Sequence, residues 1–385
     1  MKAVVLILHA FRDLIIRYLP RMKKKGGFAF IVHPRNLPDV YRKYPFLKFL
    51  SEPKLKWFLS HYWPVVLSEV EGLKDKTGKK VRGWIIAVPL TPEQMLENRE
   101  LANRKIVQSI KLAEKNGAQI VGLGALTASL TKGGLDLKNK VKAGITTGRA
   151  YTTKTVVLTV VSIAEKLGIN LKKSTVAIVG AAGGIGSACT KILTARGVKN
   201  FILVDLKRKM SSMEDLIYEI QNEKVASDIV FKTSSSVHDV YPADIIIAAT
   251  NTPDVVIGVH DLKPGAIVVN DAQPSDISTD VYKEREDVLV IEGGVINTPG
   301  IKYHFNFGLL DKEDTFCCLG EVMALASINY KKDYATGCLD ISLIDDISKI
   351  SENLNFRLAE FQNPIEGRIS QIKINKIKDL IKNKY

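Results

Sequence analysis

The sequence predicts a doubly wound α/β fold, and three observations lead to that prediction. An apolar run at 175–179 is followed directly by the glycine-rich loop Gly180-Ala-Ala-Gly-Gly-Ile-Gly186 and a helical pattern. Further apolar runs alternate with helical segments as far as residue 291, as expected for parallel strands buried on both faces. The chain has 385 residues, enough for a second domain. We therefore expect a Rossmann-type parallel sheet together with a second α/β substrate domain.

In the first half, Thr91 and Gln94 form a capping-box pattern and predict a helix that continues to Asn116. Gly117 is expected to end that helix. The other expected elements of this half are strands at 28–34 and 80–88, a short apolar run at 120–123, a turn at 146–148 and a helix over 151–167.

In the second half, strand and helix alternate from residue 175 onward. A helix is expected to follow the glycine loop as far as about Arg196. The strands predicted here are 175–179, 201–204, 229–232, 244–249, 266–270 and 288–291.

These elements suggest five segments. They are a basic amphipathic segment at 1–27, a substrate domain at 28–150, a dinucleotide-binding domain at 151–312, a helical return at 313–362 and a basic tail at 363–385.

The net charge of +14 is concentrated at the two ends of the chain. Residues 1–25 carry seven Lys/Arg and one Asp, and residues 366–385 carry six Lys/Arg and two acidic residues. The first segment is too short and too interrupted to span a bilayer, and it lacks a signal-peptide cleavage site. Two interpretations stay open: helices that lie in a membrane interface, or helices that pack on the protein. No motif for nucleic-acid binding accompanies the charge.

The four cysteines predict neither a disulfide framework nor a metal site. Cys317 and Cys318 are neighbours in sequence, and no Cys-x-x-Cys or Cys/His cluster suggests zinc. A reducing cytoplasm is the expected compartment.

The glycine loop predicts a dinucleotide site because it follows a strand and opens a helix, where backbone amides can hold a pyrophosphate. Asp205 is 19 residues beyond Gly186 and could bind the ribose hydroxyls of NADH, whereas Lys207 and Arg208 could hold the 2′-phosphate of NADPH. The predicted cofactor residues are Gly180, Ala182, Gly183, Gly184, Ile185, Gly186, Asp205, Lys207, Arg208, Ala249 and Thr250. No Tyr-x-x-x-Lys follows the loop, which weakens a short-chain dehydrogenase reading.

Cys318 is the predicted catalytic residue. Asp314 or Thr315 is expected to cap a helix that runs to about Asn329 and places Cys318 in its first turn. The helix dipole would there favour the thiolate, the nucleophilic form. Cys317 lies on a different face. The open alternative is that both cysteines are buried apolar residues.

Several stretches, taken together, resemble the long-chain fatty acyl-[acyl-carrier-protein] reductases best known from cyanobacteria. The similar stretches are Thr175 to Cys189, Gly122-Leu-Gly-Ala-Leu-Thr127, Thr146-Thr-Gly148, Ile291-Glu-Gly-Gly-Val295 and Phe316-Cys-Cys-Leu-Gly-Glu321. The resemblance covers roughly residues 28 to 360. Asp205 and Arg149 depart from the family pattern, the first by standing where a non-acidic residue is usual.

The resemblance implies that Cys318 accepts the acyl group of a long-chain thioester, carried by acyl carrier protein or coenzyme A. Hydride from NADPH, or alternatively NADH, would then release a fatty aldehyde. Tyr151, Tyr303 and His304 are the candidates for the general acid. A basic surface suits acidic carriers, and a basic amphipathic end would permit peripheral membrane contact.

Two alternatives remain open from the sequence. One is a shikimate or amino-acid type dehydrogenase that uses a lysine and an aspartate and needs no cysteine. The other is a nicotinamide-binding protein that interacts with a membrane or a partner and catalyses no reaction.

Overall fold

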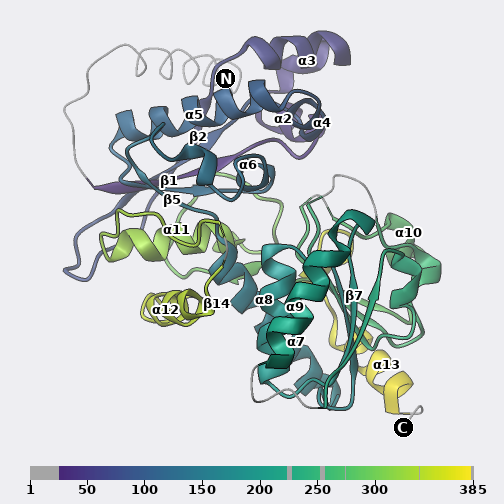
Figure 1. Ribbon diagram of the computed structural model, residues 1–385. Helices are drawn as coiled ribbons and strands as arrows, with labels where there is room; N and C mark the ends of the chain where they lie inside the picture. The colour runs from purple at the N-terminus through teal and green to yellow at the C-terminus, as the bar shows by residue number, and fades with distance from the viewer. Residues whose placement is uncertain (1–25, 223–227, 252–255, 274, 338, 383–385) are drawn as a thin grey trace.

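The computed structural model describes residues 26–222, 228–251, 256–273, 275–337 and 339–382. Its two large β-sheets are joined by a long helix (Figure 1). Residues 1–25, for which an amphipathic helix was predicted, lie outside the described residues.

The first sheet has the strand order β2-β3-β1-β4-β5. All neighbouring strands are parallel except the edge pair β2 and β3. The central strand β1 is apolar and almost entirely buried, as expected for a strand covered on both faces. The five strands are β1 (Gly27–Val32), β2 (Val65–Val70), β3 (Arg82–Ala87), β4 (Ile120–Leu123) and β5 (Gly144–Thr146).

The helix predicted from Thr91 to Asn116 is two helices, α4 (Pro92–Glu97) and α5 (Arg99–Asn116). The predicted capping box is present, and Gly117 ends α5 in the left-handed conformation. The prediction of one helix is wrong because Asn98 leaves the helical conformation, and its side chain accepts a hydrogen bond of 2.9 Å from Leu101 N. The other helices of this part are α2 (Leu37–Lys43), α3 (Glu52–His61) and α6 (Leu126–Leu130).

The second sheet is the predicted Rossmann-type sheet. Its order is β11-β10-β9-β6-β7-β8, and every neighbouring pair is parallel. The order reverses beside β6, which is the doubly wound arrangement. The strands are β6 (Thr175–Val179), β7 (Asn200–Val204), β8 (Val230–Ser234), β9 (Ile245–Ala248), β10 (Ile267–Asn270) and β11 (Leu289–Glu292). The fold class predicted from the sequence is confirmed.

Helices cover both faces of this sheet (Figure 1). The long α7 (Arg149–Leu167) leads into it from the first sheet and ends at Gly168, as predicted. The others are α8 (Gly184–Ala195), α9 (Met210–Asn222) and α10 (Thr279–Glu284).

After the second sheet the chain returns to the first. The short strands β12 (Val295–Asn297), β13 (Asp314–Phe316) and β14 (Arg357–Leu358) form a small sheet. Helices α11 (Cys317–Ser327) and α12 (Ile341–Glu352) lie between β13 and β14 in the chain. Helix α11 packs on the first sheet, where Val322 lies in one buried cluster with Phe28 and Ile120. The return carries Cys318 to the junction between the two sheets.

The chain finishes with the hairpin strands β15 (Gln362–Asn363) and β16 (Gly367–Arg368) and the helix α13 (Gln371–Lys382). Ile374 and Ile377 of α13 are buried in the core of the second sheet, and Lys376 pairs with Glu286 at 2.6 Å. Of the two interpretations left open for the basic tail, the structure shows packing on the protein for α13.

Candidate active site between the two sheets

The glycine loop leaves no room for side chains at its closest approaches. Gly180 has a positive φ of 85°, and a Cβ on it would lie 2.6 Å from the carbonyl oxygen of Ala249. A Cβ on Gly186 would lie 2.3 Å from the carbonyl oxygen of Gly180. Gly183 then occupies the N-cap position of α8. The loop therefore presents bare backbone at a helix N-terminus, which fits the pyrophosphate of a dinucleotide.

Asp205 directly follows β7 and faces this loop. Its carboxylate accepts hydrogen bonds from the backbone N–H of Ala182 at 2.9 Å and of Leu206 at 2.8 Å. Lys207 and Arg208 come next and are exposed. Asp205 and the two basic residues are thus grouped at the carboxyl end of β7, where a Rossmann-type fold binds the ribose.

Ala249 and Thr250 continue beyond β9 and lie against Gly180. Thr250 donates from its hydroxyl to Asp276 at 2.5 Å. Burial raises the pKa of Asp276 to about 6. The predicted cofactor residues therefore come together along the carboxyl ends of β6, β7 and β9.

Cys318 is the second residue of α11, and Phe316 occupies the N-cap position. The prediction that Asp314 or Thr315 caps this helix is wrong, because both residues pair with β12 in strand β13. Gly148 packs directly on Cys318: a Cβ on that glycine would lie 2.2 Å from the Cys318 Cβ. Cys318 is partly exposed, whereas Cys317 is buried.

The expectation of a ready thiolate is also wrong. Burial, and next the negative charge of Asp271, raise the pKa of Cys318 to about 12. Backbone hydrogen bonds from Leu319 and Cys318 act in the opposite direction and do not offset this. Burial raises the pKa of Cys317 as well. In this state Cys318 is a thiol, and any attack by its sulfur requires a base.

Arg149 connects Cys318 with the glycine loop. It follows Gly148 in sequence, and its guanidinium lies 3.3 Å (Nη1) from where a Cβ on Gly184 would stand. The same Nη1 donates to the carbonyl oxygen of Gly337 at 2.9 Å. The sulfur-bearing helix and the cofactor loop are therefore on either side of one short segment, 148–149.

The Glu321 side chain holds the segment 148–149 in place through hydrogen bonds. Its carboxylate accepts hydrogen bonds from the backbone N–H of Gly148 at 3.0 Å and of Tyr151 at 2.8 Å, and from the hydroxyl of Thr146. Burial raises the pKa of Glu321. The carboxylate occupies the N-terminus of α7, whose first N–H groups lack partners within the helix.

Two acidic residues of this region did not appear among the sequence-based candidates. Asp271 follows β10, and burial, Glu292 and Asp276 raise its pKa well above the ordinary value. Glu292 ends β11, and burial raises its pKa to about 7. Both lie at carboxyl ends of predicted parallel strands, where ligands of such sheets bind, and that position was the signal available in the sequence.

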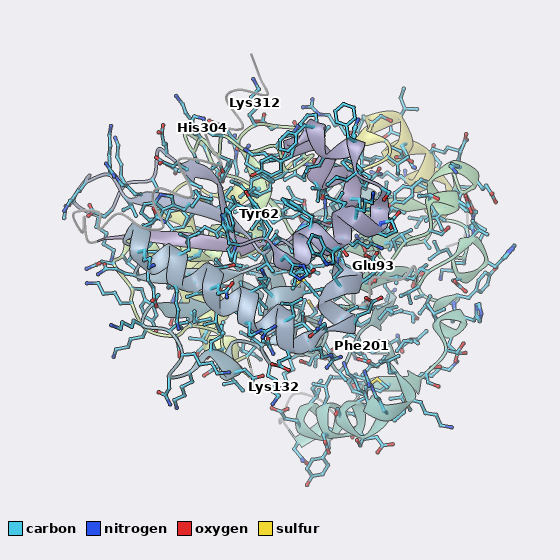
Figure 2. The ribbon with its side chains drawn as sticks, turned by 90° about the horizontal axis from the view of Figure 1, so that it is seen from above. Tyr62, Glu93, Lys132, Phe201, His304 and Lys312 are labelled. Atoms are coloured by element: carbon cyan, nitrogen blue, oxygen red, sulfur yellow. The ribbon has the colours of Figure 1, made fainter. Side chains whose placement is uncertain are left out.

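The three general-acid candidates have different surroundings. His304 is exposed and 3.5 Å from Glu71, toward the edge of the molecule (Figure 2). The hydroxyl of Tyr303 bonds to that of Thr298 at 2.5 Å. Tyr151 is buried against α11, where a Cβ on Gly320 would lie 3.0 Å from its ring, and burial raises its pKa. Among the described residues, none of these three forms a hydrogen bond with the Cys318 side chain, whereas the Asp271 charge acts on that thiol.

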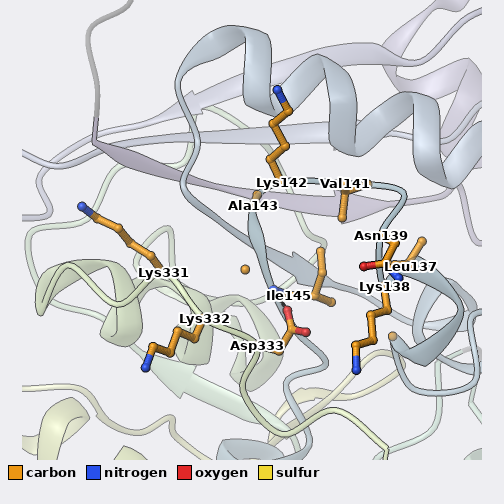
Figure 3. Close-up of a pocket in the computed structure, with 12 residues that line it drawn as sticks. Leu137, Lys138, Asn139, Val141, Lys142, Ala143, Ile145, Lys331, Lys332 and Asp333 are labelled. Carbon is orange, nitrogen blue, oxygen red and sulfur yellow. Dashed lines mark hydrogen bonds between the residues drawn. The ribbon is translucent and has the colours of Figure 1, made fainter.

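A separate pocket of about 260 Å³ lies beside β5 and is lined by exposed lysines. Lys142, Lys331 and Lys332 point in different directions around it (Figure 3). Such diverging ammonium groups are typical of a solvated face.

In the described part of the chain there is no cluster of acidic, histidine and cysteine side chains that could hold a metal, and no helix there is long and apolar enough to cross a membrane.

A family match supports the class of protein that this geometry suggests. Residues 162–292 match the family described as shikimate / quinate 5-dehydrogenase. That segment holds the glycine loop and the second sheet. Together with the loop geometry, the match supports an NAD(P)-dependent oxidoreductase.

Two curated proteins are similar over most of the chain. A long-chain acyl-[acyl-carrier-protein] reductase from Synechococcus elongatus is 25% identical over 337 residues, covering 82% of this chain and 93% of that protein. The aminotransferase PigE from Serratia sp. is 29% identical over 288 residues, or 74% of this chain. The chain spans only 33% of that aminotransferase.

The solved structures that match are more distant. L-tryptophan dehydrogenase from Nostoc punctiforme has a TM-score of 0.39 and 14% identity, covering 93% of this chain and 88% of that one. Quinate dehydrogenase from Corynebacterium glutamicum in complex with NAD has a TM-score of 0.34 and 14% identity, covering 94% and 100%. Likeness at this level carries no information on the substrate.

Proposed function

We propose that the protein is an NAD(P)H-dependent reductase that converts long-chain acyl thioesters to fatty aldehydes through a thioester on Cys318. The observation that carries this proposal is the contact of Cys318 with Gly148, whose neighbour Arg149 packs on Gly184 of the glycine loop. A nucleophile adjacent to a dinucleotide loop suits an acyl group that is held on the enzyme while it is reduced. The similarity to the Synechococcus reductase supports the same reading.

Asp271 is the residue we assign to proton transfer. The Cys318 thiol must lose its proton as its sulfur attacks the thioester carbonyl, and Asp271 is the charged group with the largest effect on that thiol. Burial raises the pKa of Asp271, and a carboxyl group that holds a proton more firmly than usual can take up the thiol proton and then return it to the departing thiol.

The backbone at the start of α11 would stabilise the oxyanion. The N–H groups of Cys318 and Leu319 already interact with the sulfur, and the first N–H groups of a helix have no partners within it. Donors placed at this point can bind the negative oxygen that develops on the carbonyl.

The residues that would hold the cofactor are those of the glycine loop with Asp205, Lys207, Arg208, Ala249 and Thr250. When bound, NADPH or NADH supplies the hydride that reduces the thioester to aldehyde. We favour NADPH because Lys207 and Arg208 are exposed and available for a 2′-phosphate, whereas the Asp205 carboxylate is occupied by two backbone N–H groups.

Acyl carrier protein or coenzyme A is the proposed acyl carrier, and residues 1–25 are proposed to contact a membrane from the cytoplasm. Seven Lys/Arg residues in that segment would attract anionic lipid. If deletion of residues 1–25 leaves co-sedimentation with anionic liposomes unchanged, the membrane contact is wrong.

The acyl-enzyme is tested by intact-protein mass after incubation with palmitoyl-coenzyme A, or with the palmitoylated carrier protein, without nicotinamide. A palmitoyl increment is expected on the natural chain and absent from Cys318→Ala. Addition of NADPH or NADH should discharge it as aldehyde. Absence of the increment with both donors would overturn the proposal.

One observation favours a second candidate. The match of residues 162–292 to the shikimate / quinate 5-dehydrogenase family is compatible with a hydroxy-acid or amino-acid dehydrogenase that forms no covalent intermediate. Nicotinamide-dependent turnover that survives Cys318→Ala would favour this candidate.

A further inference from the structure

A pocket of about 370 Å³ lies between the carboxyl ends of the two sheets. From the first sheet, its lining includes Arg35 and Arg42, which follow β1; from the second, it includes Gln273 and Glu292, which follow β10 and end β11. Phe307 and Phe316 form an apolar wall. The carboxyl edge of parallel strands is where open α/β sheets bind ligands.

The polar side of this pocket is a preformed pair of guanidinium groups. Arg35 bonds to the Asp39 carboxylate through Nε at 2.9 Å and Nη2 at 3.3 Å, and Arg42 Nη2 lies 3.2 Å from the same carboxylate. Burial alone would raise the pKa of Asp39. The Arg35 hydrogen bond and the charges of both arginines outweigh burial, so the pKa is lowered overall and the carboxylate is ionised. Two guanidinium groups share the Asp39 carboxylate, which leaves one positive charge on these three side chains. Glu292 also lines the pocket and interacts with the Arg35 charge; burial raises its pKa to about 7, so its own negative charge is mostly absent below that pH.

The remaining N–H groups of this pair are accessible. Within the described residues they have no further hydrogen-bond partner, and the side chains of Arg35 and Arg42 are 33% and 49% exposed. Gly308 lies over both: a Cβ on it would be 3.7 Å from Arg35 Nη2 and 3.9 Å from Arg42 Nη1. A glycine at this position leaves the guanidinium groups open to a ligand.

The pocket is connected to Cys318 through two chain segments. Glu292 lines it and begins the segment 292–294, whose Gly294 carbonyl accepts a hydrogen bond of 2.9 Å from Cys317 N. Phe316 also lines it and is two residues before Cys318. Two short chain segments therefore connect the wall of this pocket with the helix that carries Cys318.

We propose that Arg35 and Arg42 bind the phosphate of a phosphopantetheine chain, the group that coenzyme A and acyl carrier protein share. The inference rests on the proposed function, in which that chain delivers its thioester to Cys318. Guanidinium groups match the geometry of phosphate oxygens. The Gln273 amide suits the amides of the chain, and the apolar wall suits its dimethyl carbon.

The test compares binding of 4′-phosphopantetheine and pantetheine to the full chain by calorimetry. Arg42→Gln is the test variant because Arg42 is the more exposed of the pair. Lys332→Gln is the control: it makes the same charge change at an exposed residue of the lysine-lined pocket. We expect the natural chain and Lys332→Gln to prefer the phosphorylated compound by about tenfold, and Arg42→Gln to lose most of that preference.

A natural chain without this preference, or a loss in Lys332→Gln that equals the loss in Arg42→Gln, would overturn the inference.

The rate of Cys318 acylation compares the two carriers. Arg42→Gln should slow transfer from palmitoyl-coenzyme A and from the palmitoylated carrier protein by similar factors, and an effect on only one would contradict a shared phosphate site. If the preference is found but no donor acylates Cys318, the proposed function fails while the phosphate site stands. If Cys318 is acylated at the same rate in Arg42→Gln, the phosphate site fails alone.

Discussion

The backbone N–H of Gly148 donates a hydrogen bond of 3.0 Å to the carboxylate of Glu321, and the same glycine packs on Cys318. Glu321 is three residues beyond Cys318 in α11, so the two side chains lie on neighbouring parts of one helix surface. The carboxylate thus holds the turn that covers the sulfur. The Gly148→Ala and Glu321→Gln variants both disturb this arrangement.

Gly148→Ala is expected to destabilise the protein and displace Cys318. The new Cβ would be 2.2 Å from the Cys318 Cβ, and φ is +78°. Gly168→Ala is a matched control, because φ is +73° there and nothing lies within 4 Å of the added atom. The control should cost about 1 kcal/mol for its backbone conformation, and Gly148→Ala about 2 kcal/mol more for the overlap. Urea denaturation measures both; equal losses would contradict the contact.

Glu321→Gln is expected to lower the free energy of unfolding by about 2 kcal/mol, because an amide NH₂ would replace one acceptor oxygen among buried donors. The donors are Gly148 N, Tyr151 N and the Thr146 hydroxyl. Glu284→Gln, at an exposed position of α10, is the control and should change little. A loss below about 0.5 kcal/mol in Glu321→Gln would mean that the carboxylate does not hold the turn.

The Cys318 thiol should react with iodoacetamide faster as pH rises, without a plateau below pH 9. Its pKa is about 12, and below the pKa the thiolate fraction grows about tenfold per pH unit. Asp271→Asn should speed this alkylation at the pH values where Asp271 is ionised, because the Asp271 carboxylate raises the pKa of the thiol. The same variant should slow acylation by palmitoyl-coenzyme A if Asp271 is the base. Mass spectrometry measures both reactions. If Asp271→Asn changes the alkylation and acylation rates in the same direction, Asp271 is not the base.

Most of the parallel sheet could be predicted because its central strands β6, β9 and β10 are nearly continuous apolar runs, a local property of the sequence, whereas the edge strand β8 mixes polar and apolar residues. The start of α11 could not be predicted. Asp314 and Thr315 are good caps by propensity, but both belong to β13, which pairs with β12, and this non-local pairing overrides the local preference. At Asn98 a local interaction was missed instead. Its side chain caps α5, but the residues on both sides have a helical pattern, so one continuous helix was predicted.

The site was predictable only in part, for a similar reason. The glycine loop and the neighbourhood of Cys318 are each compact in sequence. The junction between them depends on Gly148, Arg149 and Gly184, which come together only when the first sheet is in place beside the second. Asp271 and Glu292 likewise meet because β10 and β11 are neighbours in the sheet.

Lys207→Gln and Arg208→Gln should each weaken NADPH binding by about tenfold and leave NADH binding unchanged, because only NADPH has a 2′-phosphate for these exposed side chains. Arg196→Gln removes a positive charge at the opposite end of α8 and is the control. Fluorescence titration gives the dissociation constants. Equal weakening for both cofactors would show general attraction rather than recognition of the phosphate.

Glu292→Gln is expected to change how stability depends on pH. Burial raises the pKa of Glu292 from 4.5 to about 7, so the native state binds the proton more tightly than the unfolded chain. The stabilisation is fully present below about pH 4.5 and is lost as pH rises to about 7. A glutamine cannot ionise, so the variant should gain about 3 kcal/mol on the natural chain between pH 4.5 and pH 8. Denaturation at the two pH values, with Glu284→Gln as the control, measures this; a difference that does not vary with pH would show that Glu292 is already ionised at acid pH in the native protein.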